Sequence, residues 1–286
     1  MTITENTKIL IVGLGLIGGS YAMALSRQGY KVSAITLEES SIKYALEKDL
    51  IVYGTTTPEP ELIAQSELII FSLYPHVFKQ WIKDYGRYIS PGTLVTDVTG
   101  VKSGIVYDIQ AMLPKGAEFI PAHPMAGREV YGVENSDDSI FRGANYIVTP
   151  TAANTPQAIE ECKKLGAILG FAAISVLSPE QHDDMIAFLS QLTHCIAVAL
   201  MTCNDTEGME FYTGDSFRDL TRIARINDDM WSELFMLNRD ALLRHMTAFE
   251  NELDKLRKTL LTSDRDEMRR MMRKSTQRRA LFDKKI

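Results

Sequence analysis

The stretch that decides the fold lies near the start of the chain, where residues 8–18 read KILIVGLGLIG. Its apolar first part is typical of a buried strand, and Gly13, Gly15 and Gly18 follow at once with the spacing GxGxxG. In this pattern the first glycine permits a tight turn, the second lets the backbone approach a pyrophosphate, and the third lets helix and strand pack closely. The strand, the glycine loop and the helix after it predict a dinucleotide-binding site.

That helix is predicted over residues 16–28, with Gly29 ending it. Its N-terminus offers unpaired N–H groups and partial positive charge, which suit the phosphates of a dinucleotide. The residues expected to bind the cofactor there are Gly13, Gly15, Leu16, Ile17 and Gly18. Ser72 and Pro75, which follow a later strand, are expected to border the same nucleotide.

Apolar runs and helical patterns alternate through the first half of the chain. Strands are predicted over residues 31–35, 68–72, 94–97 and 118–121, and a helix over residues 40–48. Strands separated by helices favour a parallel sheet covered on both faces. The predicted fold class is therefore an α/β Rossmann-type doubly wound sheet domain, and a strand, helix and strand over residues 146–149, 157–169 and 172–176 extend the same pattern.

The pattern changes after Ser178, beyond which no strand is predicted. Helices are expected over residues 180–201, 217–226, 230–260 and from 264 onward. The chain is thus predicted to contain a dinucleotide-binding domain over residues 1–178 and an all-α substrate and dimerisation domain over residues 179–286. The last helix is basic and is interpreted as a solvated surface.

The composition is that of an ordinary globular protein, with 286 residues, 45% of them hydrophobic, and a net charge of −6. Such a mildly acidic chain argues against nucleic acid as the main ligand. The first eight residues lack the apolar core of a signal peptide, no membrane span is predicted, and the three cysteines show no CxxC spacing. We therefore expect a cytoplasmic protein with free thiols and no metal site, and no nucleic acid or membrane as partner.

The choice between NAD and NADP depends on the end of the second strand, where NAD-binding proteins of this fold carry an acidic residue. Thr36 occupies that position, and a neutral residue removes repulsion against a 2′-phosphate. No arginine follows, however, and Leu37, Glu38 and Glu39 do not suit a phosphate, although Lys43 could reach it. Both cofactors stay open, with a slight preference for NADP.

The leading catalytic candidate is His123, which begins the run HPMAG directly after a predicted strand. Loops after the carboxyl ends of strands face the cofactor in a doubly wound sheet. An imidazole in such a loop can act as a base near neutral pH. A lone histidine is more often structural, so the position of His123 is what favours catalysis.

Five runs together make the chain resemble the prephenate/arogenate dehydrogenases of tyrosine biosynthesis, in their monofunctional form. They are GLGLIGGS, DVTGVK, HPMAG, SPEQHD and FRDLTRIA, beginning at residues 13, 97, 123, 178 and 217. The resemblance implies a Rossmann-type domain and a helical domain through which two copies form a homodimer. It also implies oxidative decarboxylation of prephenate, the small-molecule substrate, to 4-hydroxyphenylpyruvate with NAD or NADP as hydride acceptor.

The resemblance assigns roles to single residues as well. His123 matches the catalytic residue that accepts a hydrogen bond from the ring hydroxyl. Arg222 matches the arginine that binds a substrate carboxylate, a task that suits a guanidinium fork. Glu129, Asp219 and Trp231 fall where relatives place a polar gate around that arginine. The alternatives are an interdomain ion pair for Arg222 and a core position for Trp231.

Two further substrate-binding candidates depart from the family pattern. Gly100 stands where relatives commonly have a serine near the substrate hydroxyl, so water, Thr99 or Ser103 would have to replace that group. Gln191 replaces the first histidine of the family's SHLPH run, near the substrate side chain. A neutral amide favours the keto group of prephenate over the ammonium group of arogenate, although arogenate oxidation to tyrosine remains the alternative.

Other interpretations stay open at this point. The pair His182-Asp183 is interpreted as structural more often than catalytic, because Ser178 caps the helix that begins there, and His194 as a packing or rim residue. A 3-hydroxy acid dehydrogenase would need a lysine on the interdomain helix, and residues 180–201 contain none. A non-catalytic dinucleotide sensor would need the glycine loop alone.

Overall fold

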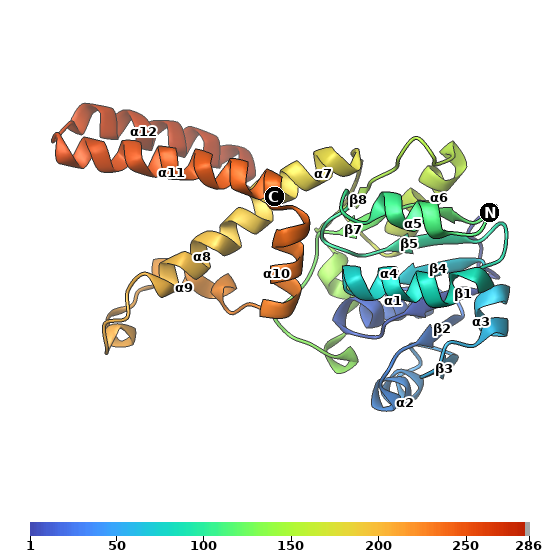
Figure 1. Ribbon diagram of the computed structural model, residues 1–286. Helices are drawn as coiled ribbons and strands as arrows, with labels where there is room; N and C mark the ends of the chain where they lie inside the picture. The colour runs from blue at the N-terminus through green and yellow to red at the C-terminus, as the bar shows by residue number, and fades with distance from the viewer. Residues whose placement is uncertain (284–286) are drawn as a thin grey trace. The chain divides into compact units, whose positions relative to one another are not determined.

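The computed structural model describes residues 1–283 and divides into two compact units, of which the first is Met1–Asn238 and the second begins at Arg239. The first unit is built on a six-stranded parallel sheet with strand order β3-β2-β1-β4-β5-β6 (Figure 1). The strands are β1 (Ile9–Val12), β2 (Val32–Ile35), β3 (Tyr53–Thr55), β4 (Leu68–Phe71), β5 (Leu94–Asp97) and β6 (Glu118–Phe119). The order reverses between β1 and β4, and dinucleotides bind at such a switch point in this class of sheet.

Helices cover both faces of this sheet, which confirms the predicted doubly wound fold. They are α1 (Leu16–Arg27), α2 (Glu39–Glu47), α3 (Pro60–Gln65), α4 (Pro75–Tyr85), α5 (Val106–Met112) and α6 (Pro156–Ile168). The strand β1 shows why the fold has two cores, because Ile9 and Ile11 pack into one buried cluster while Leu10 and Val12 pack into the other. Alternate side chains of a strand point to opposite faces, so a strand buried on both sides is apolar throughout.

The later strands keep the predicted pattern of strand, helix and strand but do not join the six-stranded sheet. The strands β7 (Ala122–Pro124), β8 (Asn145–Val148) and β9 (Ala173–Val176) form a separate sheet, in which β7 and β8 are antiparallel. The chain leaves the main sheet because side chains bind the backbone of Ala122: its N–H donates to Asp97 Oδ1 at 3.2 Å, and its carbonyl accepts from Lys102 Nζ at 2.5 Å. The strand and helix over residues 53–55 and 60–65 were also missed.

The rest of the first unit is helical. It contains α7 (Pro179–Ile186), a π-helical turn (Ala187–Gln191), α8 (Leu192–Thr202), α9 (Asp215–Thr221) and α10 (Asp228–Leu237). The predicted helix over residues 217–226 ends at Thr221 and continues only as a 3₁₀ turn over Arg222–Ala224. In residues 1–283, β9 is the last strand, as predicted, and the domain boundary near Ser178 remains a prediction.

The predicted single helix over residues 230–260 is broken at Asn238. Its buried side chain donates from Nδ2 to the carbonyl of Asp183 and to Gln191 Oε1, each at 2.8 Å, and its backbone leaves the helical conformation. The second unit then contains α11 (Arg239–Leu261) and α12 (Arg265–Arg279), and the side chain of Asp264 caps α12. Residues 284–286 of the basic tail lie outside the described residues.

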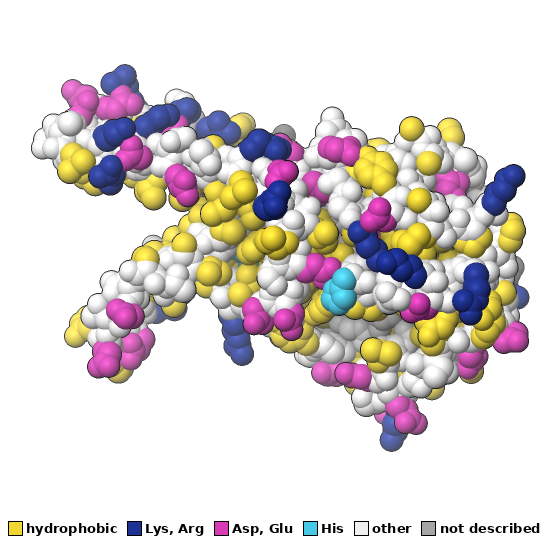
Figure 2. All heavy atoms as spheres, in the orientation of Figure 1, with side chains coloured by type: hydrophobic (Ala, Val, Ile, Leu, Met, Phe, Trp, Pro, Cys, Tyr) yellow, Lys and Arg dark blue, Asp and Glu magenta, His cyan; other side chains and the backbone are white. Residues whose placement is uncertain are grey.

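One continuous helical run, Pro179–Thr202, is long and apolar enough by composition to cross a membrane, and only 28% of its most apolar window is buried. The sequence had predicted no such span. Core helices of soluble proteins pass the same test, so the run is weak evidence for a membrane. Exposed apolar side chains on it include Met185, Leu189 and Met201, and Figure 2 shows hydrophobic side chains gathered over this part of the first unit.

Candidate active site

The glycine loop has the geometry that a dinucleotide requires. A Cβ at Gly18 would meet the carbonyl oxygen of Gly13, and one at Gly13 the carbonyl oxygen of Ser72, both closer than the 3.0 Å that real Cβ atoms respect. Gly15, by contrast, has no neighbour within 4 Å of a Cβ, so its backbone faces open space. Helix α1 begins at Leu16 and Ile17 with no side-chain cap, which leaves its first N–H groups available to a pyrophosphate.

The neighbouring cofactor candidates lie around this loop. Ser72 follows β4 directly and its N–H donates to the carbonyl of Val12 at 2.8 Å, while Pro75 is the first residue of α4. Thr36 follows β2 directly, and its Oγ1 accepts from the N–H of Leu14 at 3.4 Å. These contacts bring the cofactor candidates together and leave the choice between NAD and NADP open.

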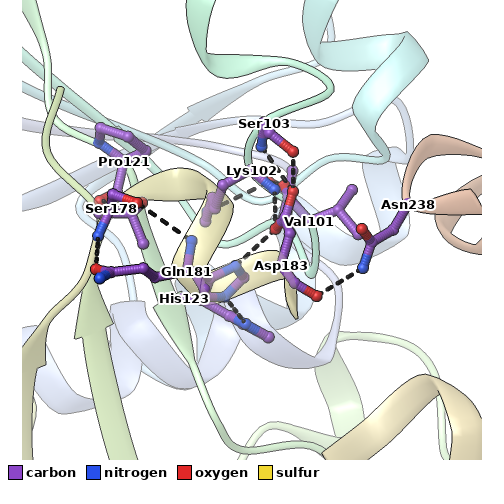
Figure 3. A network of polar contacts seen from close by, with 12 residues as sticks. Val101, Lys102, Ser103, Pro121, His123, Ser178, Gln181, Asp183 and Asn238 are labelled. Atoms are coloured by element: carbon purple, nitrogen blue, oxygen red, sulfur yellow. Dashed lines mark hydrogen bonds and ion pairs between the residues drawn. The ribbon is translucent and has the colours of Figure 1, made fainter. Parts of the chain in front are cut away.

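A chain of hydrogen bonds starts at the partly buried His123 on β7. His123 Nδ1 lies 2.8 Å from Nε2 of His182, and His182 Nδ1 lies 2.8 Å from Asp183 Oδ1 (Figure 3). A carboxylate only accepts hydrogen bonds, so Asp183 assigns the proton of neutral His182 to Nδ1. His182 Nε2 must then accept, and His123 must donate from Nδ1. These hydrogen bonds therefore leave Nε2 of neutral His123 as an acceptor.

The pKa values of the three groups agree with this assignment. Burial, reinforced by His182 and by the charge of Lys102, lowers the pKa of His123 well below its usual range. Burial also lowers the pKa of His182, against the opposing effect of Asp183. Burial alone would raise the pKa of Asp183, but hydrogen bonds from His182 and Ser103 outweigh it and lower that pKa. Two neutral imidazoles and one carboxylate result at neutral pH.

Asp183 is held in place by the loop that follows β5. Its Oδ1 accepts from the N–H of Lys102 and its Oδ2 from the N–H of Ser103, both at 2.8 Å, and the Ser103 hydroxyl also donates to Oδ2 (Figure 3). The ammonium of Lys102 is fully buried and binds both oxygens of Asp97, at 2.8 and 2.9 Å. This buried pair lies beneath β7, because Lys102 also binds the carbonyl of Ala122, the residue before His123.

A second cluster surrounds Arg222. Its guanidinium forms an ion pair with Glu129, and both side chains are exposed. This contact fits both the predicted gate and the alternative of an interdomain ion pair, so the gate stays a prediction. His194 stacks on Trp231 with ring centroids 3.7 Å apart, and the charges of Glu129 and Arg222 both act on its pKa, which burial lowers. Asp219 is exposed on α9, one turn before Arg222. Trp231 is thus a partly exposed stacking partner, and His194 belongs to this cluster.

Two domain models of one family match the chain. The model described as prephenate dehydrogenase, nucleotide-binding domain, matches residues 21–175, and the one described as prephenate dehydrogenase, dimerization domain, matches residues 178–274. The prephenate dehydrogenase of Bacillus subtilis is 30% identical over 267 residues, which are 87% of this chain and 69% of that protein. The chain belongs to the prephenate dehydrogenase family.

Solved structures of the prephenate dehydrogenase family agree. The prephenate dehydrogenase of Aquifex aeolicus, solved with hydroxyphenyl propionate and NAD+, has a TM-score of 0.90 and 28% identity, and the match covers 99% of this chain and 100% of that one. The arogenate dehydrogenase of Synechocystis has a TM-score of 0.84 and 25% identity, with 97% and 100% covered. Family membership decides against the 3-hydroxy acid dehydrogenase interpretation.

The two positions that depart from the prephenate dehydrogenase pattern are explained differently by the structure. A Cβ at Gly100 would lie 3.4 Å from Leu234 Cδ1, an ordinary contact, so the glycine is not required by packing. Gln191 is buried, and its amide binds protein at both ends: Nε2 donates to the carbonyl of Leu234 at 3.0 Å, and Oε1 accepts from Asn238. Its contact with substrate stays a prediction, and its visible role is to hold α10.

Sequence reasoning missed the connection between His182-Asp183 and His123. It interpreted the pair as structural, and the capping box formed by Ser178 and Gln181 does begin α7 there (Figure 3). The pair also takes part in the hydrogen bonds to His123, because both side chains are buried, His182 is turned toward β7, and Asp183 binds the other ring nitrogen of His182. A buried histidine followed by an aspartate, in a helix that starts directly after the sheet domain, was the available signal.

Proposed function

We propose that the protein oxidises prephenate to 4-hydroxyphenylpyruvate and carbon dioxide, with NAD+ or NADP+ reduced by the hydride. The observation that carries the proposal is the hydrogen-bond chain from Asp183 through His182, which leaves Nε2 of neutral His123 as an acceptor. A cyclohexadienol with a ring hydroxyl and a ring carboxylate needs such an acceptor, because removal of the hydroxyl proton helps the hydride to leave.

His123 holds the substrate hydroxyl and takes its proton at Nε2. As the carbon–hydrogen bond at the same ring carbon breaks, the ring carboxylate leaves as carbon dioxide, and its bonding electrons complete the aromatic ring. The phenolate oxygen then takes the proton back from Nε2 of His123, which gives the hydroxyl group of 4-hydroxyphenylpyruvate and restores the neutral imidazole. A bound nicotinamide dinucleotide supplies the hydride acceptor. The low pKa of His123 keeps it neutral, so it is ready to accept at neutral pH.

Arg222 binds a substrate carboxylate in this proposal. The guanidinium is already paired with Glu129, and both partners are exposed, so the ion pair can open at little cost when a carboxylate arrives. The stacked rings of His194 and Trp231 beside this pair provide a flat wall for the substrate. Asp219 is assigned only to the outer edge of the gate.

The dinucleotide binds at the glycine loop, with its pyrophosphate on the N-terminus of α1. Support comes from the open space at Gly15 and from the Aquifex relative, which was solved with NAD+. The preference for NADP rests on the neutral Thr36 and on the reach of Lys43, and it is opposed by Glu38 and Glu39. NAD or NADP is therefore proposed without a choice between them.

We further propose a homodimer formed through residues 178–274, the range that matches the family's dimerization domain. The exposed apolar side chains of α7 and of the π-helical turn after it, among them Met185 and Leu189, favour burial against a second copy. Light scattering of the purified protein measures the assembly. A monomer at micromolar concentration would contradict the proposal.

The activity test measures reduction of NAD+ and NADP+ by the purified protein with prephenate and, separately, with arogenate. Faster turnover of prephenate is expected, because Gln191 is neutral. Faster turnover of arogenate would replace the substrate assignment. Binding of a dinucleotide without turnover of either substrate would favour the sensor and contradict the proposed enzyme.

A further inference from the structure

Helix α10 is bound to the start of α4 through the carboxylate of Glu233. The backbone N–H of His76 donates to Oε1 of Glu233 at 2.7 Å, and His76 Nδ1 lies 2.8 Å from Oε2. Glu233 has only 19% of its side chain exposed, although His76 is largely in solvent. Because Pro75 is the first residue of α4, the carboxylate sits at the N-terminus of that helix, where the helix dipole favours negative charge.

A second contact joins the same two helices. Asn227, which caps α10 through its own side chain, donates from Nδ2 to the hydroxyl of Tyr74 at 3.3 Å. Tyr74 is the residue before α4 begins. The start of α4 is thus bound to α10 and its N-cap at two points, six residues apart in sequence.

The segment held in this way borders the cofactor loop. Ser72, at the end of β4, supplies the carbonyl oxygen that makes a side chain impossible at Gly13, and its own Cβ lies against Gly18. Only two residues separate Ser72 from Pro75, so a shift of the start of α4 moves the residues packed on the glycine loop. Glu233 therefore acts on the dinucleotide side of the site.

The other faces of α10 belong to the substrate side. Trp231 stacks on His194 in the Arg222 cluster, and Leu234 lies against Gly100, in the loop that also carries Lys102. The carbonyl of Leu234 is fixed by Gln191. One ten-residue helix thus contacts residues from both halves of the site.

We infer that Glu233 is a positioning residue that couples dinucleotide binding to substrate binding, through its two bonds to His76. The inference rests on the proposed function. A dinucleotide that orders the segment 72–76 also orders α10 and with it Trp231 and Leu234. The substrate then binds to side chains that are already ordered, so its binding costs less conformational entropy. By thermodynamic linkage the substrate strengthens dinucleotide binding by the same factor.

The test is a calorimetric titration of the oxidised dinucleotide that the wild-type protein reduces faster, with and without saturating 4-hydroxyphenylpyruvate, the proposed product. We expect the product to tighten dinucleotide binding about fivefold or more in the wild type, a common size for such coupling. In Glu233→Ala, which removes both bonds, the factor is expected to fall toward one, and in His76→Ala, which keeps the backbone bond, it is expected to fall part of the way. Binding of the dinucleotide alone is expected to change less than about twofold in both variants. Joining both substitutions is expected to add nothing.

The control is Asp229→Asn, which removes one negative charge from the first turn of the same helix. It is expected to keep the wild-type coupling, and circular dichroism confirms folding of each variant. Wild-type coupling in Glu233→Ala, or a factor of one in the wild-type protein, would overturn the inference alone. Absence of dinucleotide reduction by the wild-type protein would instead overturn the proposed function.

Discussion

The glycine loop and the histidine chain, which is the series of hydrogen bonds from Asp183 through His182 to His123, carry out their tasks by different physical means. In the loop the backbone faces the ligand, and Gly13 and Gly18 are fixed by carbonyl oxygens that leave no room for a side chain. In the histidine chain the side chains act, and the position of each proton follows from the carboxylate of Asp183. The first region should therefore be sensitive to added volume, and the second to a change in charge or in hydrogen-bonding capacity.

The largest expected effect is that of Gly18→Ala. The new methyl would meet the backbone carbonyl of Gly13, which cannot rotate away, so we expect a loss of stability of about 3 kcal/mol and no measurable dinucleotide binding. The matched control is Gly15→Ala, where the methyl enters open space and the stability of the free protein is expected to stay near the wild-type value. Thermal unfolding and dinucleotide titration measure both, and a Gly18→Ala protein as stable as the wild type would contradict the account of the loop.

The next effect is that of His123→Asn, which keeps a polar side chain but removes the imidazole acceptor. Loss of a general base typically costs between about 10² and 10⁴ in kcat. Steady-state kinetics with prephenate measures this effect, with dinucleotide binding as the control that should not change. Wild-type turnover would remove His123 from the mechanism.

The hydrogen-bond chain predicts a smaller effect for His182→Ala, with a signature in the pH profile. We expect kcat to fall about 10²-fold, because His123 is free to take the wrong tautomer. His182 also lowers the pKa of His123, so its loss should raise that pKa and move the acid limb of kcat/KM to higher pH. In the wild type kcat/KM should be retained as the pH falls through the usual range of histidine and be lost only below it.

His182→Gln tests whether the role is hydrogen bonding. The amide oxygen can accept from His123 Nδ1, so part of the lost kcat should return. Equal activity in the Ala and Gln variants, with the wild-type pH profile in both, would leave His182 with packing alone.

Arg222→Ala is expected to raise the KM for prephenate between about 10-fold and 10²-fold while kcat falls only a few-fold, as the loss of a charge-assisted hydrogen bond predicts. The matched control is Arg218→Ala, about one turn earlier on α9 and paired with Asp215 on the surface. A KM that is unchanged in Arg222→Ala, or raised equally in Arg218→Ala, would contradict the assignment.

The smallest effect is expected for Gly100→Ser. The added Cβ lies at an ordinary contact distance from Leu234, so the fold should be unchanged. The hydroxyl restores the group that relatives carry near the substrate, and kcat should rise less than about tenfold. A strong fall in kcat would show that the space at Gly100 is itself required.

The two regions also differ in how well the sequence predicts them. The glycine loop is contiguous, and its strand, turn and helix follow from local sterics and apolar pattern, so residues 8–28 could be predicted closely. The histidine chain joins His123 and His182, which are 59 positions apart in the sequence. The N–H of Lys102 donates to Asp183, which lies 81 positions further along. No local pattern indicates such pairs, and so His182 was interpreted as structural.

The errors in the fold have the same cause. The strand β7 leaves the main sheet because Asp97 and Lys102 bind the backbone of Ala122, and the long helix breaks at Asn238 because its amide binds Asp183 and Gln191. In both places a buried side chain far along the sequence outweighs the local periodicity. Arg222 and Glu129, by contrast, were placed together through the family resemblance, and the structure pairs them.

The most direct test of the central claim is the tautomer of His123, read from the nitrogen chemical shifts of the protein labelled with ¹⁵N-histidine and assigned with the His123→Asn variant. At neutral pH we predict a neutral ring protonated at Nδ1, with Nε2 unprotonated, and loss of this state in His182→Ala. A proton on Nε2, or an imidazolium ring, in the wild-type protein would contradict the proposal that His123 accepts the substrate hydroxyl.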